Sequence, residues 1–545
     1  MLPIFKHSLR CGLAAALICA APAVFADPPK DAPKDGPAAD AKPGKANPWE
    51  EKKHQSQGAV TIRGKHVEYN AVGGTLMIED KKGLPGAMMS YVAYFKKGEA
   101  STKRPITFIY NGGPGSATLW LHMGAFGPKR VLAGDAERGP AAPYKVIDND
   151  NSTLDVSDLV FIDMPGTGFG RIGIDEKSVE PDKAEATAKK NEELKKDFFG
   201  VDQDIRAFDI FITKFLTRYE RWNSPRFLFG ESYGTMRSAG LVRKLQSENV
   251  DMNGVMLLSQ ILNYASSADG ARNELGEDLP FVMSLPSFTS TAWFHKKLPN
   301  QPKDLEPLLA EVRKFALTDY QSALAQGDSL PADQKKAMAA KLATYTGLPA
   351  DYIEKADLRV NGGMFRKTLL DKEGLITGRL DTRYTSYATD PMSKESDYDP
   401  QSSSISSAYV SAFNDYARGT LGFGREAELA VSADGAGRLW DTKHQPPGAT
   451  NPLPKTPNVI PDLAAAIRTN PKLKVMLCSG YFDLSTLFFA GEYELNHMNL
   501  PVELRKNVEI HHFMTGHMVY VNDEASKQLH DYFATFVNTN APQGK

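Results

Sequence analysis

Six short, continuous apolar runs limit the folds that are open to this 545-residue chain. They are separated by stretches with helical periodicity and lie at residues 106–110, 159–163, 227–229, 255–259, 473–478 and 508–513. A strand that is apolar along its whole length is covered on both faces, which is typical of a mostly parallel sheet with helices outside it. The runs therefore predict an α/β fold with a doubly wound, mostly parallel central sheet.

The region 266–454 has a different character, because strand-like runs are scarce there. A set of its apolar residues has the spacing of one helix face, with charged residues between them, namely Leu305, Leu308, Leu309, Val312 and Phe315. We interpret 266–454 as a largely helical insertion, or cap, that divides the core into 51–265 and 455–545. Its apolar face fits core packing, and an insertion over the strand ends also fits the wall of a binding cleft.

Residues 1–26 have the three-part plan of a secretory signal peptide. A short basic region precedes an apolar run, and a small-residue cleavage site ends at Ala26. The apolar run is short for a bilayer span, so we favour a cleaved signal over an uncleaved membrane anchor. Ile18 precedes Cys19 where a lipoprotein signal has a small residue, which argues against a lipid anchor. We expect export to the periplasm or secretion, with no stable membrane insertion after cleavage.

Residues 27–50 are rich in Pro, Ala, Lys and Asp and contain almost nothing to bury. The prolines favour extended, unpaired backbone, so we interpret this segment as a flexible tether between the signal and the fold. Binding of a cell-envelope partner by the same segment is the less favoured alternative.

The composition excludes several classes of function. The 64 basic and 66 acidic residues give a formal net charge of −2, which provides no general electrostatic footprint for nucleic acid or anionic lipid. Signal cleavage would leave Cys478 as the only cysteine, so no intramolecular disulfide can form. We find no metal-finger spacing and no internal repeat, and we expect no metal, no cofactor and no nucleic-acid partner. We assign no oligomeric state.

The segment 226–234 reads as a strand that runs into the pentapeptide G-x-S-x-G. Its two glycines allow a sharp turn, which would expose Ser232 at the end of the strand and the start of the next helix. The pentapeptide alone is weak evidence. The apolar strand before it and the helical pattern after it, with Met236, Ala239 and Leu241, give it weight. We therefore predict Ser232 as a nucleophile.

A serine nucleophile needs a base and a group that orients the base. In hydrolases with this turn, an acid and then a histidine follow the serine along the chain. Asp483 lies in the loop after the run 473–478, and His517 lies in the loop after the run 508–513. Both loops follow the carboxyl ends of strands, where open α/β sheets bind their ligands. We assign Ser232, Asp483 and His517 as a catalytic triad.

Other histidines and acids are weaker candidates for the triad. The histidines lie within the last strand, after a helical stretch or near the C-terminus, and they are His511, His512, His497 and His530. Two glutamates lie further from the strand end than Asp483 does, and they are Glu492 and Glu494. A packed or surface role is the simplest interpretation of the four histidines.

The segment 111–115, Asn-Gly-Gly-Pro-Gly, follows the run 106–110. An acyl-transfer site needs hydrogen-bond donors for the tetrahedral oxyanion, and glycines let the backbone approach a substrate closely. The N–H that follows the nucleophile, from Tyr233, would supply a second donor. A purely structural turn is the alternative. Because the same chain also contains a nucleophile turn, we prefer to interpret this segment as an oxyanion loop.

At these residues the sequence resembles the serine carboxypeptidase family, within the α/β-hydrolases. The resemblance runs in the family's order over about 90–520 and is carried by the segments 111–115, 163–169, 231–233, 480–483 and 516–518. It implies an α/β-hydrolase fold, with the insertion where the family has its own. Because it lacks disulfide cysteines, the sequence resembles bacterial members of the family more than vacuolar or lysosomal ones.

The resemblance implies a role for each matched residue. Ser232 would be the nucleophile, His517 the base and Asp483 the acid that orients it. The backbone N–H groups of Gly113 and Tyr233 would bind the oxyanion.

Asn111 and Glu231 would hold the terminal carboxylate of the substrate, by the same resemblance. A glutamate can donate a hydrogen bond to a carboxylate only when it is protonated, and the neighbouring negative charge raises its pKa. We therefore expect activity to fall as the pH rises through the pKa of Glu231.

The sequence departs from the family at three positions. Ser116 stands where many relatives have a disulfide cysteine, Tyr481 replaces a common acidic residue, and Tyr520 stands near a frequent proline. None of the three belongs to the triad, but they bear on the shape of the pocket.

The function predicted from the sequence is that of an exported serine carboxypeptidase. It would hydrolyse the C-terminal bonds of peptides or proteins through an acyl-enzyme on Ser232. An esterase or acyltransferase on the same fold is the first alternative, since a fold does not fix a substrate. A non-catalytic binding protein that retains the fold is the second.

Overall fold

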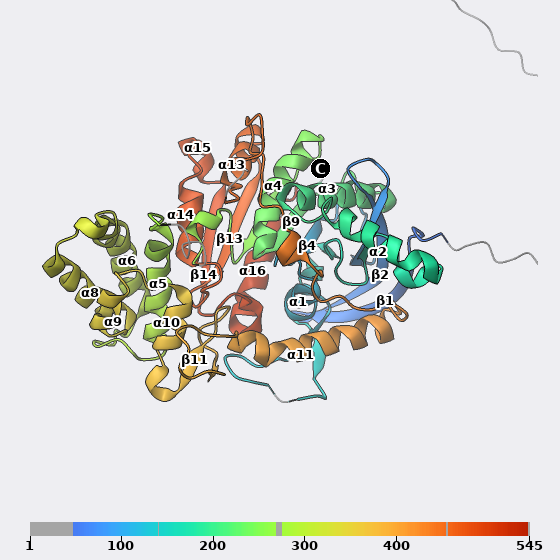
Figure 1. Cartoon of the computed structure of the whole chain (residues 1–545). Coiled ribbons are helices and arrows are strands. Elements are labelled where there is room, and N and C mark those ends of the chain that lie inside the picture. The colour runs from blue at the N-terminus through green and yellow to red at the C-terminus, as the bar shows by residue number, and fades with distance from the viewer. Residues whose placement is uncertain (1–46, 140, 269–274, 454–455, 543–545) are drawn as a thin grey trace, which may run out of the picture. The chain divides into compact units, whose positions relative to one another are not determined.

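All six predicted strands form in the computed structural model, and they lie side by side in one sheet (Figure 1). The structure describes residues 47–139, 141–268, 275–453 and 456–542. Two predicted runs match their strands residue for residue, β4 (Ile106–Tyr110) and β14 (Val508–Phe513). The other four differ from the predicted bounds only at their ends, and they are β7 (Asp158–Ile162), β9 (Arg226–Glu231), β10 (Gly254–Leu258) and β13 (Lys474–Gly480).

The six strands run parallel to one another in the order β7-β4-β9-β10-β13-β14. Beyond β7 the sheet continues as antiparallel strands, which are β3 (Pro85–Lys96), β2 (Lys65–Glu79) and β1 (Lys53–Ile62), with β8 (Arg171–Ile172) paired to β3. These antiparallel strands are not among the predicted ones. Much of β1 and the first half of β2 is exposed or alternates in burial, so neither is a continuous apolar run.

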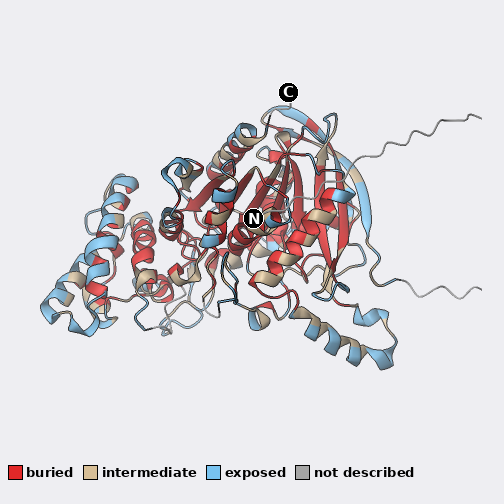
Figure 2. Ribbon diagram, turned by 90° about the horizontal axis from the view of Figure 1, so that it is seen from above, coloured by how far each residue is buried: buried red, intermediate tan, exposed pale blue. Residues whose placement is uncertain are grey.

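Alternate residues of the parallel strands face two separate hydrophobic cores. On one face, side chains such as Phe108 and Leu228 pack against α3 (Val201–Arg218), α4 (Tyr233–Ser247) and α13 (Ile460–Thr469). On the other face, side chains such as Phe229 and Met476 pack against α11 (Pro400–Asp415) and α16 (Asp523–Asn540). The buried strands between these layers explain why the runs are apolar throughout (Figure 2).

The insertion begins with a helical part that has its own hydrophobic cluster. Its helices include α5 (Leu279–Phe294), α6 (Leu305–Phe315), α7 (Gln321–Leu324), α8 (Ala332–Thr346), α9 (Ala350–Lys355) and α10 (Gly362–Thr368). The predicted apolar face of α6 is buried at Leu305, Leu309, Val312 and Phe315, and its fifth residue, Leu308, is partly buried against the same cluster. The cluster also contains core residues from α14 (Phe488–Asn496), so the insertion packs directly on the chain that follows β13.

The second part of the insertion returns to the core. A short hairpin of β11 (Leu375–Thr377) and β12 (Thr385–Tyr387) leads to α11, which packs on the sheet face that carries Phe229 and Met476. Residues 47–545 form one compact unit, so the division at 265/266 and 454/455 stays a prediction.

The predicted signal peptide 1–26 and residues 27–46 of the predicted tether lie outside the described residues. Within the described part of the chain, no helix is long and apolar enough to cross a membrane. In that same part, no group of three or more His, Cys, Asp or Glu side chains could hold a metal ion. Cys478 is a free thiol buried in β13.

Candidate active site

Ser232 lies at a strained turn between β9 and α4. Its backbone has φ of 60° and ψ of −130°, in a region that non-glycine residues rarely adopt. Gly230 makes this turn possible, because a Cβ there would lie 2.2 Å from the carbonyl oxygen of Gly234. The turn presents the Ser232 side chain to a cavity, which is the geometry of a nucleophile elbow.

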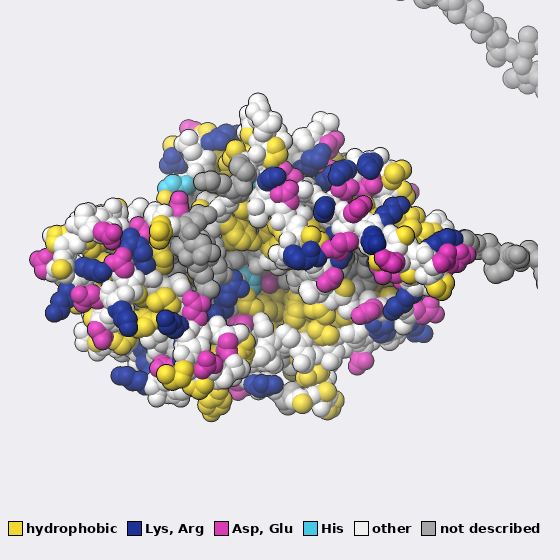
Figure 3. Space-filling view, viewed as in Figure 1, with side chains coloured by type: hydrophobic (Ala, Val, Ile, Leu, Met, Phe, Trp, Pro, Cys, Tyr) yellow, Lys and Arg dark blue, Asp and Glu magenta, His cyan; other side chains and the backbone are white. Residues whose placement is uncertain are grey.

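The cavity has a volume of about 790 Å³ and is lined by residues from the sheet loops and from the insertion. Its walls include the segment 111–113, the elbow, Arg379 and Leu380 from the insertion, and Ile405 from α11. Figure 3 shows the surface hollowed near the middle of this face, with apolar side chains in the hollow. A space of this size suits a small organic or peptidic ligand.

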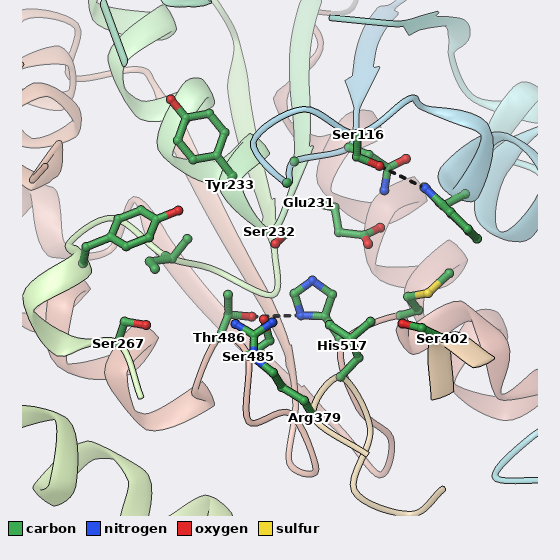
Figure 4. A pocket seen from close by; sticks show the side chains of 18 of the residues that line it. Ser116, Glu231, Ser232, Tyr233, Ser267, Arg379, Ser402, Ser485, Thr486 and His517 are labelled. Carbon is green, nitrogen blue, oxygen red and sulfur yellow. Dashed lines mark hydrogen bonds between the residues drawn. The ribbon is translucent and has the colours of Figure 1, made fainter. Parts of the chain in front are cut away.

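His517 and Asp483 form a buried pair beside Ser232. The Nδ1 atom of His517 lies 2.7 Å from Oδ2 of Asp483. An ionised carboxylate only accepts hydrogen bonds, so Nδ1 carries the proton and Nε2 is left as the basic atom. Figure 4 shows the hydroxyl of Ser232 directed toward the His517 ring, on the side away from Thr486.

The carboxylate of Asp483 is held by its own loop. The backbone N–H groups of Ser485 and Thr486 donate to Oδ1 at 2.7 and 3.0 Å, and the Thr486 hydroxyl donates to Oδ2 at 2.7 Å. Thr486 was not identified from the sequence. Asp483 itself favours an Asx-type turn, in which its carboxylate accepts the backbone N–H two residues on, but that pattern does not identify the Thr486 side chain.

A segment of the insertion, 379–383, ties the acid loop to the histidine loop. Three of its backbone bonds are Leu484 N–H to Arg379 O at 3.0 Å, Thr382 N–H to Phe482 O at 2.9 Å and His517 N–H to Leu380 O at 2.7 Å. Two side-chain bonds add to these, Gly516 N–H to Asp381 Oδ2 at 3.1 Å and Arg383 Nη2 to Thr515 Oγ1 at 2.8 Å. The insertion therefore fixes the positions of both loops.

The loop 111–115 lies directly on the elbow. A Cβ at Gly112 would stand 2.4 Å from the backbone nitrogen of Tyr233, so only glycine allows this approach. Tyr233 is the first residue of α4, and its N–H therefore has no acceptor within the helix. Gly113 and Tyr233 both line the cavity with Ser232. Their backbone donors can converge on an oxygen above the serine.

A buried ion pair contacts the start of this loop. Arg237 Nε lies 2.6 Å from Asp204 Oδ2, and Arg237 Nη1 donates to the carbonyl oxygen of Asn111 at 2.8 Å. Neither charged side chain is exposed to solvent. Because a guanidinium presents several donors in a fixed plane, Arg237 holds the start of the loop in one position.

Glu231 and Asn111 lie at the same wall of the cavity. The Asn111 side-chain oxygen accepts the backbone N–H of Leu121 at 3.2 Å, so the NH₂ group is its donor, and the same side chain also hydrogen-bonds to Glu231. Tyr520 donates its hydroxyl hydrogen to Oε2 of Glu231 at 2.9 Å. Burial raises the pKa of Glu231 to about 7, against the opposing effects of His517 and of the hydrogen bonds from Tyr520 and Asn111.

The structure brings all seven predicted site residues together. Six of them line the cavity, namely Asn111, Gly113, Glu231, Ser232, Tyr233 and His517. Asp483 lies behind His517 and is fully buried. Their chemical roles stay predictions.

The rival histidines and acids make other contacts. His512 Nε2 lies 2.7 Å from Glu492, and His511 stacks on Tyr532 with ring centroids 3.8 Å apart. Glu494 accepts a backbone N–H from Leu262 at 2.9 Å. The remaining two are His497, stacked on Tyr493, and His530, beside Asp155 and Asp531. None of the six lines the cavity of Ser232.

Comparison with known proteins identifies similar sequences and folds. Residues 82–277 match the profile of a family described as serine carboxypeptidase. This match contains the loop 111–115 and the elbow, and it ends before Asp483 and His517. A search of the curated proteins finds no match.

Among solved structures, the chain is similar to Kex1(Δ)p, a prohormone-processing carboxypeptidase from Saccharomyces cerevisiae. The TM-score is 0.52 at 12% identity, over 86% of this chain and 92% of that chain. It is also matched to a proline iminopeptidase from Mycobacterium smegmatis, at TM-score 0.35 and 11% identity over 86% of this chain and 98% of that chain. The predicted α/β-hydrolase fold is confirmed by the first of these likenesses.

Proposed function

We propose that this chain, whose residues 82–277 match the profile of the serine carboxypeptidase family, is an exported exopeptidase that acts through an acyl-enzyme on Ser232. One observation carries the proposal. A serine at a nucleophile elbow shares a cavity with a histidine–aspartate pair and with the two side chains suited to a terminal carboxylate, Asn111 and Glu231.

The acyl-enzyme would form in one addition and one elimination. Ser232 Oγ attacks the scissile carbonyl carbon while His517 Nε2 takes the hydroxyl proton. The negative oxygen of the tetrahedral intermediate accepts hydrogen bonds from the N–H groups of Gly113 and Tyr233. His517 then gives the proton to the leaving nitrogen, and the C–N bond breaks. Water repeats the sequence on the ester and restores the free Ser232 hydroxyl.

Recognition of a C-terminus depends on the proton of Glu231. A carboxylate substrate offers only acceptors, so Glu231 must be protonated to donate to it, while Asn111 donates from its amide. The pKa of Glu231, raised to about 7 by burial, keeps the group protonated below neutral pH. An ester or an amide has no terminal charge that would require this arrangement.

His517 sets the opposite requirement. Burial by itself lowers the pKa of His517, but the charge and hydrogen bond of Asp483, together with the charge of Glu231, raise it above the usual value. The base must be neutral to accept a proton, so activity is lost as the pH falls through this pKa. Because His517 and Glu231 interact, the two limbs of the pH profile belong to the pair rather than to either residue.

A peptide with a free C-terminus is expected to be cleaved with a kcat/KM about a hundredfold above that of its C-terminal amide. For the free acid, kcat/KM should fall as the pH rises through about 7, because Glu231 then loses the proton that it donates. For the amide this alkaline limb should be absent. Initial rates of both peptides across the neutral pH range measure the effect.

Glu231→Gln is the matched variant for this measurement, since glutamine donates from its amide at every pH. It should retain cleavage of the free acid and lose the alkaline limb. Equal turnover of acid and amide in the wild type would exclude the carboxypeptidase function and favour an esterase or other acyl-transfer activity.

Export is supported by the basic, apolar and small-residue plan of 1–26. When the full-length chain is expressed in a bacterium, we expect it outside the cytoplasm with Asp27 as its first residue. Cell fractionation and N-terminal mass analysis measure both. A chain that starts at Asp27 after an initiator Met should stay in the cytoplasm. Recovery of the full-length chain with 1–26 intact in the cytoplasm would contradict export.

A further inference from the structure

The hydrogen bond between Tyr520 and Glu231 lies outside the triad and the oxyanion loop. The donor and acceptor oxygens are 2.9 Å apart, and the two side chains are 1% and 3% exposed. Tyr520 belongs to the short 3₁₀ turn η9 (Val519–Val521), which follows His517. One short segment of chain therefore carries both the base and the partner of Glu231.

The fold leaves room for this tyrosine at a glycine. Gly124 lies in the π-helical turn η1 (His122–Phe126), and a Cβ there would stand 2.5 Å from Cε2 of Tyr520 and 2.7 Å from the Tyr409 hydroxyl. Real Cβ atoms do not approach other atoms so closely. The ring of Tyr520 is thus packed directly against backbone, and its hydroxyl has little freedom to leave Glu231.

The hydrogen bond from Tyr520 makes the two carboxyl oxygens of Glu231 inequivalent. Oε2 accepts from the tyrosine, so in the protonated acid the hydrogen belongs on Oε1. Oε1 is then the donor for a ligand. Asn111 lines the same wall, with its side-chain oxygen already engaged by Leu121.

We propose that Tyr520 is a positioning residue for the substrate's terminal carboxylate, which fixes Glu231 with its proton on the oxygen that serves the substrate. The inference rests on the proposed role of Glu231 in carboxylate recognition. Tyr520 acts through Glu231 and does not take part in the bond-making steps.

The titratable groups that face Glu231 are His517, Asp483, Tyr409 and Tyr520, and the Asn111 amide also hydrogen-bonds to it. Burial raises the pKa of both tyrosines well above the usual value, so both hydroxyls stay protonated near neutral pH. Burial raises the pKa of Glu231 most, and Asp483 adds to the rise, while His517 and the hydrogen bonds from Tyr520 and Asn111 lower it. Loss of the Tyr520 hydroxyl therefore raises the pKa of Glu231.

Tyr520→Phe tests the proposal, because it removes one hydroxyl and keeps the ring. With the free-acid peptide, kcat/KM should fall about tenfold at the optimum, mainly through KM, and the alkaline limb should move to higher pH. With the amide, kcat/KM should change less than about twofold. Tyr320→Phe is the matched control, since it removes a buried hydroxyl bonded to Leu358 O at 2.6 Å in the insertion.

An unchanged alkaline limb and an unchanged KM in Tyr520→Phe, in an enzyme that still discriminates acid from amide, would overturn the inference and leave the proposed function intact. Loss of discrimination in the wild type would instead overturn the proposed function. If Tyr520→Phe does not fold, Gly124→Ala displaces the ring and should give the same rise in KM for the acid alone. Equal losses for acid and amide in that variant would contradict a positioning role.

Discussion

Ser232→Ala is expected to lower kcat for peptide cleavage by roughly 10⁶-fold, to the level supported by binding and the oxyanion donors alone. The variant keeps the elbow, since alanine can adopt the backbone of residue 232 no worse than serine does. Single-turnover and steady-state rates on a free-acid peptide measure the loss. A fluorophosphonate should add its mass to the wild type and not to the variant.

Ser406→Ala is a suitable control, because Ser406 lines the same cavity from α11. It should be labelled and active like the wild type. A folded wild type that resists labelling would favour a non-catalytic binding protein. Labelling that persists in Ser232→Ala would assign the nucleophile to another residue.

The six parallel strands of the central sheet were predictable because the signal is carried within each of them. Every residue of β4 and β10 is buried, since both faces are covered, and the result is a continuous apolar run. β1 and β2 carry no such run, because β2 alternates in burial over its first half and β1 is largely exposed. Polar residues on the exposed face interrupt the pattern that identified the other strands.

The elbow and the oxyanion loop were predictable for a similar reason. A side chain at Gly230 would collide with the backbone of Gly234, only four residues away, so both glycines fall within the one pentapeptide G-x-S-x-G. Contacts between distant segments leave no such signal. Tyr520 and Glu231 are 289 residues apart, and Gly516 and Asp381 are 135 apart. Tyr520 could be noted only as a departure from the family, with no indication of the side chain that it contacts.

The acid of the triad was placed by chain order, and the structure adds the reason why its charge matters. Oδ1 of Asp483 accepts two backbone N–H groups, and Oδ2 accepts from Thr486 and from His517. All four bonds require an acceptor. Asparagine offers one acceptor and one donor, so the substitution cannot satisfy both sides of the carboxylate.

Asp483→Asn is expected to lower kcat roughly 10⁴-fold with little change in KM or in thermal stability. The side-chain oxygen will take the place of Oδ1, where two backbone donors hold it, and the NH₂ group will then face Nδ1 of His517. Nδ1 must accept that hydrogen, so the histidine carries its proton on Nε2, opposite Ser232. In this tautomer the base cannot take the serine proton. Rates and fluorophosphonate labelling should fall together.

Thr486→Val distinguishes the effect of the Asp483 charge from that of the hydrogen bonds that hold it, because it removes one donor to Asp483 and keeps the carboxylate. Its kcat should fall no more than about tenfold, the value of one hydrogen bond.

The pKa of His517 should also drop in Asp483→Asn, since the charge that raises it is gone, and any residual activity should extend to lower pH. A loss below about tenfold in Asp483→Asn would assign the orienting acid to another residue, because a wrong tautomer costs far more than one hydrogen bond.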